Sequence, residues 1–379
     1  MPGLGFGGSP GHEQGKQGEG AALDPLGPAA PDPVLEGAGG SAPCRVQGSA
    51  LALLMTPLLS VRDLRVVFDT RRGPLTAIDG VSFDIAAGEI LGVVGESGAG
   101  KSLTGTAVIG LLDPPGRIAG GEIWLEGRRI DTLPPEAMRK IRGREIGAIF
   151  QDPLTSLHPL LTVGDQLTET IRTHLPLDRA AARARAIDLL REVGIPSAET
   201  RVDQHPHQFS GGMRQRVVIA LALAGEPKLI IADEPTTALD VSIQAQITAL
   251  LRRLGRQHGT GVMLVTHDMG VIAETADRVA VMYAGRLVEI GPVAQVIRAP
   301  RHPYTAGLMA SIPRMGRREH ELRQIDGSMP RLGSIPPGCA FNPRCPAASD
   351  RCRGETPVLG GGAHDAACWH PVEESAHAG

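Results

Sequence analysis

The stretch Gly95-Glu96-Ser97-Gly98-Ala99-Gly100-Lys101-Ser102 matches the pattern G-x-x-x-x-G-K-[ST]. The apolar run Ile90–Val94 before it is typical of a buried strand, and Ser102–Leu112 can form a helix. In such a unit, glycines let backbone N–H groups surround phosphate oxygens, and the helix N-terminus adds a partial positive charge. The stretch predicts a phosphate-binding loop, with Lys101 reaching the β- and γ-phosphates of a nucleotide and Ser102 ligating Mg²⁺. A glycine-rich turn without a ligand is the alternative.

Apolar runs and helical patterns alternate along much of the chain. Strands that alternate with helices, such as the helical pattern over Ser242–Leu254, predict a parallel, layered α/β core. The stretch of about residues 152–222 is rich in Ala, Leu and Arg, with helical spacing over Arg179–Val193, and predicts a helical insertion. The other strand candidates are Leu59–Phe68, Val81–Ile85, Gly147–Phe150, Leu229–Ala232, Val262–Val265 and Val279–Met282.

Length and charge limit the classes of function. The chain has 379 residues, 38 of them basic and 41 acidic, and its net charge of −3 gives no reason to expect a nucleic-acid partner. The longest apolar runs fall well short of the ~20 residues that cross a bilayer. Any role at a membrane therefore has to run through partner subunits.

Residues 1–54 differ from the rest of the chain. They are dense in Gly and Pro and contain one aromatic residue, Phe6. A segment of this composition cannot bury enough surface to fold alone, which predicts a disordered tail. It also lacks the basic start and continuous apolar core of a secretory signal. The alternative is that translation starts at Met55, just before the first strand-like run.

A second motif, Leu229–Pro235, is an apolar run that ends in the two acids Asp233 and Glu234. A strand of this kind places carboxylates at the carboxyl edge of a sheet, where open α/β folds bind ligands. Asp233 suits Mg²⁺ coordination, and Glu234 can polarise an attacking water. An ordinary solvated strand end is the alternative.

A third motif, Ser210-Gly211-Gly212, stands before the helical run Met213–Leu223. A helix start of this kind is also suited to an anion. Two phosphate-binding helix starts in one chain suggest a nucleotide held between two subunits. A capped helix that binds no ligand explains these residues equally well when they are taken alone.

In their order and intervals, these motifs resemble those of the ATP-binding subunits of ABC transporters. The resemblance implies an α/β P-loop NTPase core, with Gly95–Ser102 as the Walker A loop. Asp233 and Glu234 correspond to the Walker B aspartate and the catalytic acid. Ser210-Gly211-Gly212 corresponds to the family signature, in which Met213 replaces the usual glutamine.

The resemblance assigns roles to four further residues. Gln151 corresponds to the Q-loop glutamine, with a part in catalysis and in Mg²⁺ binding, and His267 to the switch histidine. Asp240, in Ala238-Leu239-Asp240, corresponds to the D-loop. Phe68 lies where the family places an aromatic ring that stacks on adenine, although a core phenylalanine is nearly as good an interpretation.

Two C-terminal stretches, His302-Pro303-Tyr304-Thr305 and Gly338–Pro346, resemble the C-terminal region of oligopeptide and dipeptide importer ATPases. The resemblance implies an ATPase domain over residues 55–300 and a C-terminal extension over 301–379. It also implies a peripheral subunit on the cytoplasmic face of the cell membrane. The expected partners are a second, different ATPase subunit, two integral membrane permeases and an extracytoplasmic substrate-binding protein.

Related ATPases have functions other than peptide import. Import of nickel or another small solute is open, because no residue of this chain should contact the substrate. A soluble ABC ATPase of DNA repair would carry long coiled-coil insertions, and this chain has no sustained heptads. Relatives that act in translation normally carry two cassettes, and this chain has one phosphate loop.

Four of the five cysteines fall near the C-terminus, in the spacing C-x5-C-x6-C-x15-C: Cys339, Cys345, Cys352 and Cys368. A cytosolic chain would not normally keep two disulfides there. Four thiolates in a segment with little apolar material suit a metal centre that helps a small fold to form. The paired C-x2-C knuckles typical of zinc are absent, whereas a [4Fe–4S] cluster tolerates this spacing. Zinc, free thiols or a disulfide remain alternatives, and His364 and His370 are nearby alternative ligands.

Overall fold

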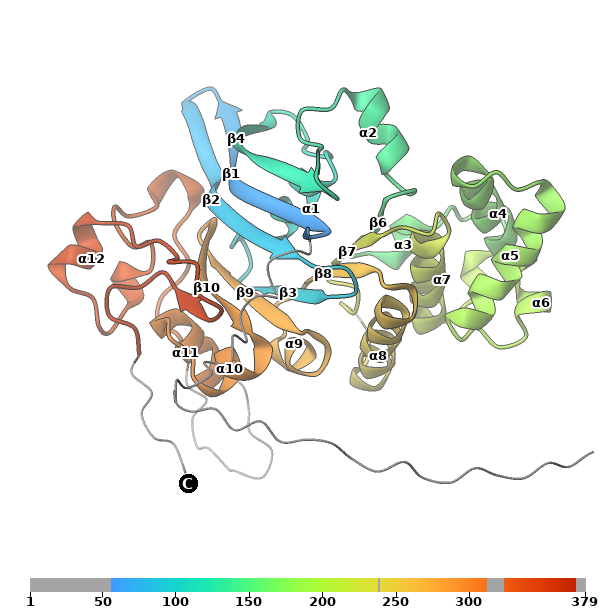
Figure 1. Cartoon of the computed structure of the whole chain (residues 1–379). Helices are drawn as coiled ribbons and strands as arrows, with labels where there is room; N and C mark the ends of the chain where they lie inside the picture. Colours follow the sequence, from blue (N-terminus) through green and yellow to red (C-terminus); the bar gives the residue numbers. More distant parts are fainter. Residues whose placement is uncertain (1–55, 238, 312–323, 373–379) are drawn as a thin grey trace, which may run out of the picture. The chain divides into compact units, whose positions relative to one another are not determined.

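We describe a computed structural model of the chain, which covers residues 56–237, 239–311 and 324–372 (Figure 1). The predictions for residues 1–54, for Met55 as a start and for Ala238 in the D-loop lie outside the described residues. Among the described residues, the strands form two sheets with different pairing.

The first sheet is antiparallel and has the strand order β2-β1-β4-β5. It consists of β1 (Leu59–Thr70), β2 (Gly73–Ile85), β4 (Gly116–Leu125) and β5 (Arg128–Arg129). Strands β1 and β2 form a long hairpin in which Leu59 pairs with Ile85 and Thr70 with Gly73. The prediction of one parallel core was incomplete, because it contained neither β4 nor a separate antiparallel sheet.

The second sheet has the order β11-β10-β9-β3-β8-β7-β6 and is parallel from β9 to β6. Its parallel strands are β3 (Ile90–Val94), β6 (Ile146–Ile149), β7 (Leu229–Asp233), β8 (Gly261–Val265) and β9 (Arg278–Tyr283). All but a few of their residues are buried, as expected for strands covered on both faces. The carboxyl ends of β3, β6, β7 and β8 therefore meet at one edge of the sheet.

The predicted helical insertion is a set of packed helices between β6 and β7 (Figure 1). Its helices are α3 (Pro153–Ser156), α4 (Val163–His174), α5 (Arg179–Glu192), α6 (Ala198–Arg201) and α7 (Gly211–Leu223). Leu167, Ile171 and Leu190 are fully buried where α4, α5 and α7 pack together. The helix α8 (Val241–His258) follows β7 and carries a buried stripe that includes Ile247 and Leu251.

Several shorter helices complete the ATPase domain. These are α1 (Lys101–Val108), α2 (Pro135–Ile141), α9 (Met269–Thr275) and α10 (Val293–Arg298). The α1 helix is shorter than the predicted Ser102–Leu112, because its last turn closes at Gly110, whose φ of +64° is left-handed. None of the helices in the described residues is both long and apolar enough to cross a membrane.

The C-terminal extension is an integral part of the ATPase sheet. It contains α11 (Pro303–Ala310), the 3₁₀ turns η2 (Leu332–Ser334) and η3 (Asn342–Arg344), and α12 (Asp350–Gly354). Its strand β11 (Asp365–Ala366) pairs with β10 (Arg286–Pro292) at the sheet edge. The rings of Tyr283, Tyr304 and Phe341 form a buried cluster with centroids 4.7 to 5.4 Å apart. The extension therefore shares its core with the ATPase domain.

Candidate nucleotide site and cysteine cavity

The phosphate loop connects β3 to α1 and requires its glycines for steric reasons. A Cβ on Gly95 would lie 2.2 Å from the carbonyl oxygen of Met282, and Gly95 has a φ of +153°. Lys101 is buried, and its Nζ donates to the carbonyl oxygens of Gly95 at 2.8 Å and Glu96 at 3.1 Å. Burial lowers the pKa of Lys101. The nearby carboxylates of Glu234 and Asp233 oppose this effect, because they favour the charged form. An ammonium group has three N–H donors, so one remains for an anion.

Ser102 and Asp233 bring a hydroxyl and a carboxylate together at this edge of the sheet. Ser102 Oγ donates to Asp233 Oδ1 at 2.8 Å. Burial raises the pKa of Asp233, and the hydrogen bond from Ser102 opposes that rise. Two adjacent oxygen ligands of this kind suit Mg²⁺, which neutralises phosphate charge.

Glu234 lies at the centre of a hydrogen-bonded group of side chains from three strand ends. Gln151 Nε2 donates to its Oε2 at 2.9 Å, and Thr237 Oγ1 donates to the same oxygen at 2.8 Å. His267 Nδ1 lies 3.1 Å from its Oε1. Gln151 follows β6, Glu234 follows β7 and His267 follows β8, so the parallel pairing brings them together. Sequence reasoning missed Thr237, which has no signal beyond its place three residues after Glu234.

The surroundings of Glu234 keep its side chain ionised. Its φ of +45° is unusual for a residue other than glycine, and its N–H donates to the carbonyl oxygen of Val265 at 2.9 Å. Burial acts to raise the pKa of Glu234, but hydrogen bonds from Thr237 and His267 outweigh this effect and lower it. The group is therefore a carboxylate held toward the carboxyl edge of the sheet.

The structure places the Ser-Gly-Gly motif at a second helix start, next to that of α8. Ser210 is the N-cap of α7 and accepts from Met213 N–H at 3.4 Å, and Asp240 is the N-cap of α8 and accepts from Ile243 N–H at 2.9 Å. A Cβ on Gly212 would lie 2.7 Å from Ile243 Cγ2. In the described part of the chain, no hydrogen bond joins Ser210–Gly212 to the phosphate loop. A role toward a nucleotide bound by another subunit therefore stays a prediction.

Phe68 lies on β1 and is partly buried against the core of the antiparallel sheet. A Cβ on Gly116 of the paired strand β4 would come within 2.9 Å of its ring. The stacking of Phe68 on adenine stays a prediction.

The four C-terminal cysteines line one small cavity in the extension. Cys339, Cys345, Cys352 and Cys368 share it with His302, Phe341 and His370, among others. The four thiols form no disulfide. Burial raises the pKa of Cys339 and Cys345, and raises that of Cys368 to about 11. Without a metal, Cys339, Cys345 and Cys368 are therefore protonated at neutral pH. Within the described residues, no group of three or more His, Cys, Asp or Glu side chains forms a site that could hold a metal ion.

His302 leaves an unpaired donor at this cavity. It is buried, and its Nδ1 accepts from Tyr304 N–H at 3.0 Å, so the ring proton of the neutral form is on Nε2. Burial lowers the pKa of His302 to about 4, which keeps the ring neutral. Its Nε2 has no hydrogen-bond partner. The other candidate ligands differ: His370 lines the cavity and contacts Ser349 Oγ at 2.7 Å, whereas His364 contacts the buried Glu289 at 2.8 Å.

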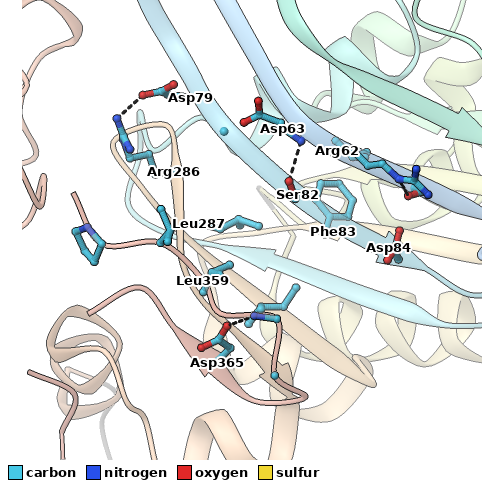
Figure 2. Close-up of a pocket in the computed structure, with 18 of the residues that line it drawn as sticks. Arg62, Asp63, Asp79, Ser82, Phe83, Asp84, Arg286, Leu287, Leu359 and Asp365 are labelled. Atoms are coloured by element: carbon cyan, nitrogen blue, oxygen red, sulfur yellow. Dashed lines mark hydrogen bonds and ion pairs between the residues drawn. The ribbon is translucent and has the colours of Figure 1, made fainter. Parts of the chain in front are cut away.

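A larger cavity of about 750 Å³ lies away from all these motifs, between the β1–β2 hairpin and the segment Thr356–Asp365 (Figure 2). Figure 2 shows its polar wall, where Arg286 pairs with Asp79 and Asp63 N–H donates to Ser82 Oγ at 2.8 Å. Asp79 also pairs with Arg65 there, at 3.5 Å. We assign it no ligand.

Comparisons with known proteins agree with this geometry. The ABC transporter family model matches residues 78–237, and the model for the oligopeptide/dipeptide transporter C-terminal region matches residues 288–352. The dipeptide transport ATP-binding protein DppD of Bacillus subtilis is 48% identical over 327 residues, which cover 86% of this chain and 98% of that protein. The chain belongs to the ATP-binding proteins of dipeptide and oligopeptide ABC transporters.

Two further comparisons extend this family assignment. The oligopeptide transport ATP-binding protein OppD of B. subtilis is 53% identical over 289 residues, covering 76% of this chain and 81% of that protein. A solved dimeric ATP-binding cassette, MJ0796, described in a post-hydrolysis state with ADP and Pi, aligns with a TM-score of 0.56 at 28% identity. It covers 62% of this chain and 98% of the cassette. The predicted family, its α/β ABC ATPase fold and the C-terminal extension are thereby confirmed.

Proposed function

We propose that this ABC transporter subunit drives import of dipeptides or oligopeptides by ATP hydrolysis at the site centred on Glu234. The observation that carries the proposal is the contact of Glu234 with Gln151 and His267 beside the phosphate loop. The relatives named for dipeptide and oligopeptide transport supply the substrate class. Import of nickel or another small solute is the alternative that a transport assay would reveal.

The phosphate loop would bind the β- and γ-phosphates through its N–H groups and Lys101. Ser102 and Asp233, which already contact each other, would hold Mg²⁺ with Gln151. When bound, Mg²⁺ supplies neutralisation of the phosphate charge. Glu234 would accept a proton from the attacking water, and His267 would hold the water and the γ-phosphate.

The site would be completed by a second subunit. Ser210 and its two glycines would contact the nucleotide in the partner's phosphate loop, with Asp240 at the subunit boundary and Phe68 against adenine. Three observations support this arrangement: the exposed position of Ser210, the lack of a bond to its own loop and the dimeric state of the MJ0796 cassette. ATP would then bridge two subunits, and hydrolysis would release them.

We infer that the transporter contains a second, different ATPase subunit, two permeases and a substrate-binding protein outside the cytoplasm. The chain would act at the cytoplasmic face of the membrane. Its ATPase domain would span residues 55–300, with the helical subdomain at about 152–222 in contact with the permeases. Residues 301–379 would form the extension.

The partner dependence can be tested by adding components stepwise. The purified chain should hydrolyse ATP slowly, and the partner ATPase and permeases should raise the rate. A Ser210→Ala subunit should depress the rate of the assembly while binding a fluorescent ATP analogue normally on its own. Full activity of a strictly monomeric preparation would contradict a shared site.

We further propose that the cysteine cavity holds a [4Fe–4S] cluster, with zinc as the alternative. The four cysteines line one cavity and form no disulfide, and four thiolates are the usual ligand set of such a cluster. The unpaired Nε2–H of His302 fits the sulfur atoms of such a group, which accept hydrogen bonds.

Elemental analysis of anaerobically purified protein tests this assignment. We expect about four irons per chain and a brown colour. Stoichiometric zinc without iron would replace the cluster with a four-thiolate zinc site. Protein without either metal would contradict both.

A further inference from the structure

The cysteine-rich extension contacts the phosphate loop directly. Arg344 lies between Cys339 and Cys345, and its Nη1 donates to both carboxylate oxygens of Glu96 at 3.0 Å. Glu96 is the second residue of the phosphate loop and lies 248 positions earlier in the chain. The contact therefore joins the two motif-rich regions of the protein.

The Arg344–Glu96 ion pair differs from the ion pairs on the protein surface. The Arg344 side chain is 7% exposed and that of Glu96 is 28% exposed. The guanidinium is also fixed from behind, because its Nε donates to the Asp326 carbonyl oxygen at 2.7 Å and its Nη2 to that of Ile325 at 3.2 Å. A charged pair held in one geometry and largely shielded from water interacts more strongly than an exposed pair.

The carboxylate, the N–H and the carbonyl oxygen of Glu96 each form a hydrogen bond that helps to fix the phosphate loop. Its carboxylate accepts from Arg344, its N–H donates to the hydroxyl of the buried Tyr304 at 2.9 Å, and its carbonyl oxygen accepts from Lys101 Nζ. Arg344 and Tyr304 both belong to the C-terminal extension. The extension thus fixes the residue whose carbonyl oxygen orients the phosphate-binding lysine.

The backbone around Arg344 is tied to the cysteines. Arg344 is the last residue of the turn η3, and its N–H donates to the carbonyl oxygen of Phe341 at 3.0 Å. The Asn342 side chain donates to the carbonyl oxygen of Cys339 at 2.8 Å. The N–H of Cys339 in turn donates to the carbonyl oxygen of Cys352 at 2.8 Å. A change in the separation of Cys339 and Cys345 would therefore move Arg344.

We propose that Arg344 is a positioning residue for nucleotide binding, which holds the phosphate loop through Glu96 and transmits the state of the cysteine cavity to it. The proposal deepens the ATPase function and rests on it. Arg344 does not touch the nucleotide in this scheme. Its loss raises the Kd and KM for ATP, and kcat at saturating ATP changes little.

The test is Arg344→Gln in the full chain, with Arg353→Gln as its control. Arg353 belongs to the same extension but pairs with Asp350 at the surface, where the side chains are 59% and 102% exposed. We expect Arg344→Gln to weaken binding of a fluorescent ATP analogue about tenfold, with kcat of the assembled transporter within about twofold of wild type. Arg353→Gln should bind as wild type. Equal affinities for Arg344→Gln and wild type would overturn the proposal.

A second variant separates positioning from folding. Glu96→Gln leaves the extension intact and removes the charge from the loop side, so it should also weaken binding about tenfold, and the double variant should be no weaker than either single variant. Additive losses would overturn the coupling. Wild-type protein that binds no ATP would instead contradict the proposed function.

The link to the cavity has its own readout. Cys345→Ser should raise the KM for ATP to a similar extent, and Cys345→Ser with Arg344→Gln should add little. A Cys345→Ser protein with wild-type KM would limit the role of Arg344 to holding the loop and would overturn the link to the cavity.

Discussion

The nucleotide site and the cysteine cavity are both assembled from residues far apart in the chain, but by different means. Gln151, Glu234 and His267 follow three parallel strands, so sheet geometry alone brings them to one edge. The cysteines lie in a segment with only short turns and helices, which is anchored where Phe341 packs against Tyr283 and Tyr304. The first site is therefore fixed by regular backbone hydrogen bonding, and the second needs tertiary contacts or a bound group to hold it.

The largest expected effect concerns the chemistry at the sheet edge. Glu234→Gln should retain ATP binding and lose about a hundred- to ten-thousand-fold in the rate of hydrolysis, because the proposed general base is removed. Phosphate release by the assembled transporter measures it. Glu136→Gln, on the surface of α2, is a matched control that should leave the rate unchanged. A near-normal rate of hydrolysis for Glu234→Gln would contradict the placement of the catalytic centre at Glu234.

Loss of the lysine should act on binding instead. Lys101→Ala removes a buried ammonium that is proposed to reach the phosphates, and nucleotide affinity should fall at least about tenfold. Titration with a fluorescent ATP analogue measures it, with Lys140→Ala on α2 as the control. If Lys101→Ala binds ATP normally, the phosphate loop does not act as assigned.

The cysteine cavity should respond in stability more than in chemistry. Cys352→Ser should lower the free energy of unfolding by about 2 kcal/mol, because the proposed metal centre would stabilise the extension and would be lost. The kcat at saturating ATP should stay within about twofold of wild type. Denaturant unfolding of metal-loaded and metal-stripped protein measures the first effect. An equal loss in metal-stripped protein would mean that the thiol stabilises by packing alone.

Much of the candidate nucleotide site could be predicted because its residues follow recognisable strands or begin helices. Glu234 follows an unbroken apolar run, and Lys101 follows glycines in a fixed pattern. Thr237 carries no such signal. The strand β4 was missed because Gly120 and Gly121 interrupt its alternation, where Gly121 takes a φ of +86° opposite a bulge in β1.

The cysteine region was harder to predict. Composition indicated that the four thiols gather, and the structure places them around one cavity. Their contact with the phosphate loop through Arg344 has no periodic or local signal, because it joins residues 248 positions apart. The unpaired Nε2 of His302 depends on a tautomer that only the contact with Tyr304 sets.

The smallest expected effect distinguishes two interpretations of Phe68. If its ring stacks on adenine, Phe68→Leu should raise the KM for ATP about fivefold, since an aromatic contact contributes about 1 kcal/mol. Phe83→Leu, in the buried face of the paired strand, should reduce stability without changing KM. If the KM for ATP of Phe68→Leu is as unchanged as that of Phe83→Leu, Phe68 belongs to the core and does not stack on adenine.

Peptide uptake by the reconstituted transporter tests the central claim most directly. The chain, its partner ATPase, the permeases and the substrate-binding protein would be placed in vesicles with a labelled dipeptide or oligopeptide. The account predicts that uptake requires Mg²⁺ and ATP and is lost when Glu234→Gln replaces the wild-type subunit. Uptake that continues undiminished with Glu234→Gln, or ATP-driven uptake of nickel but of no peptide, would contradict it.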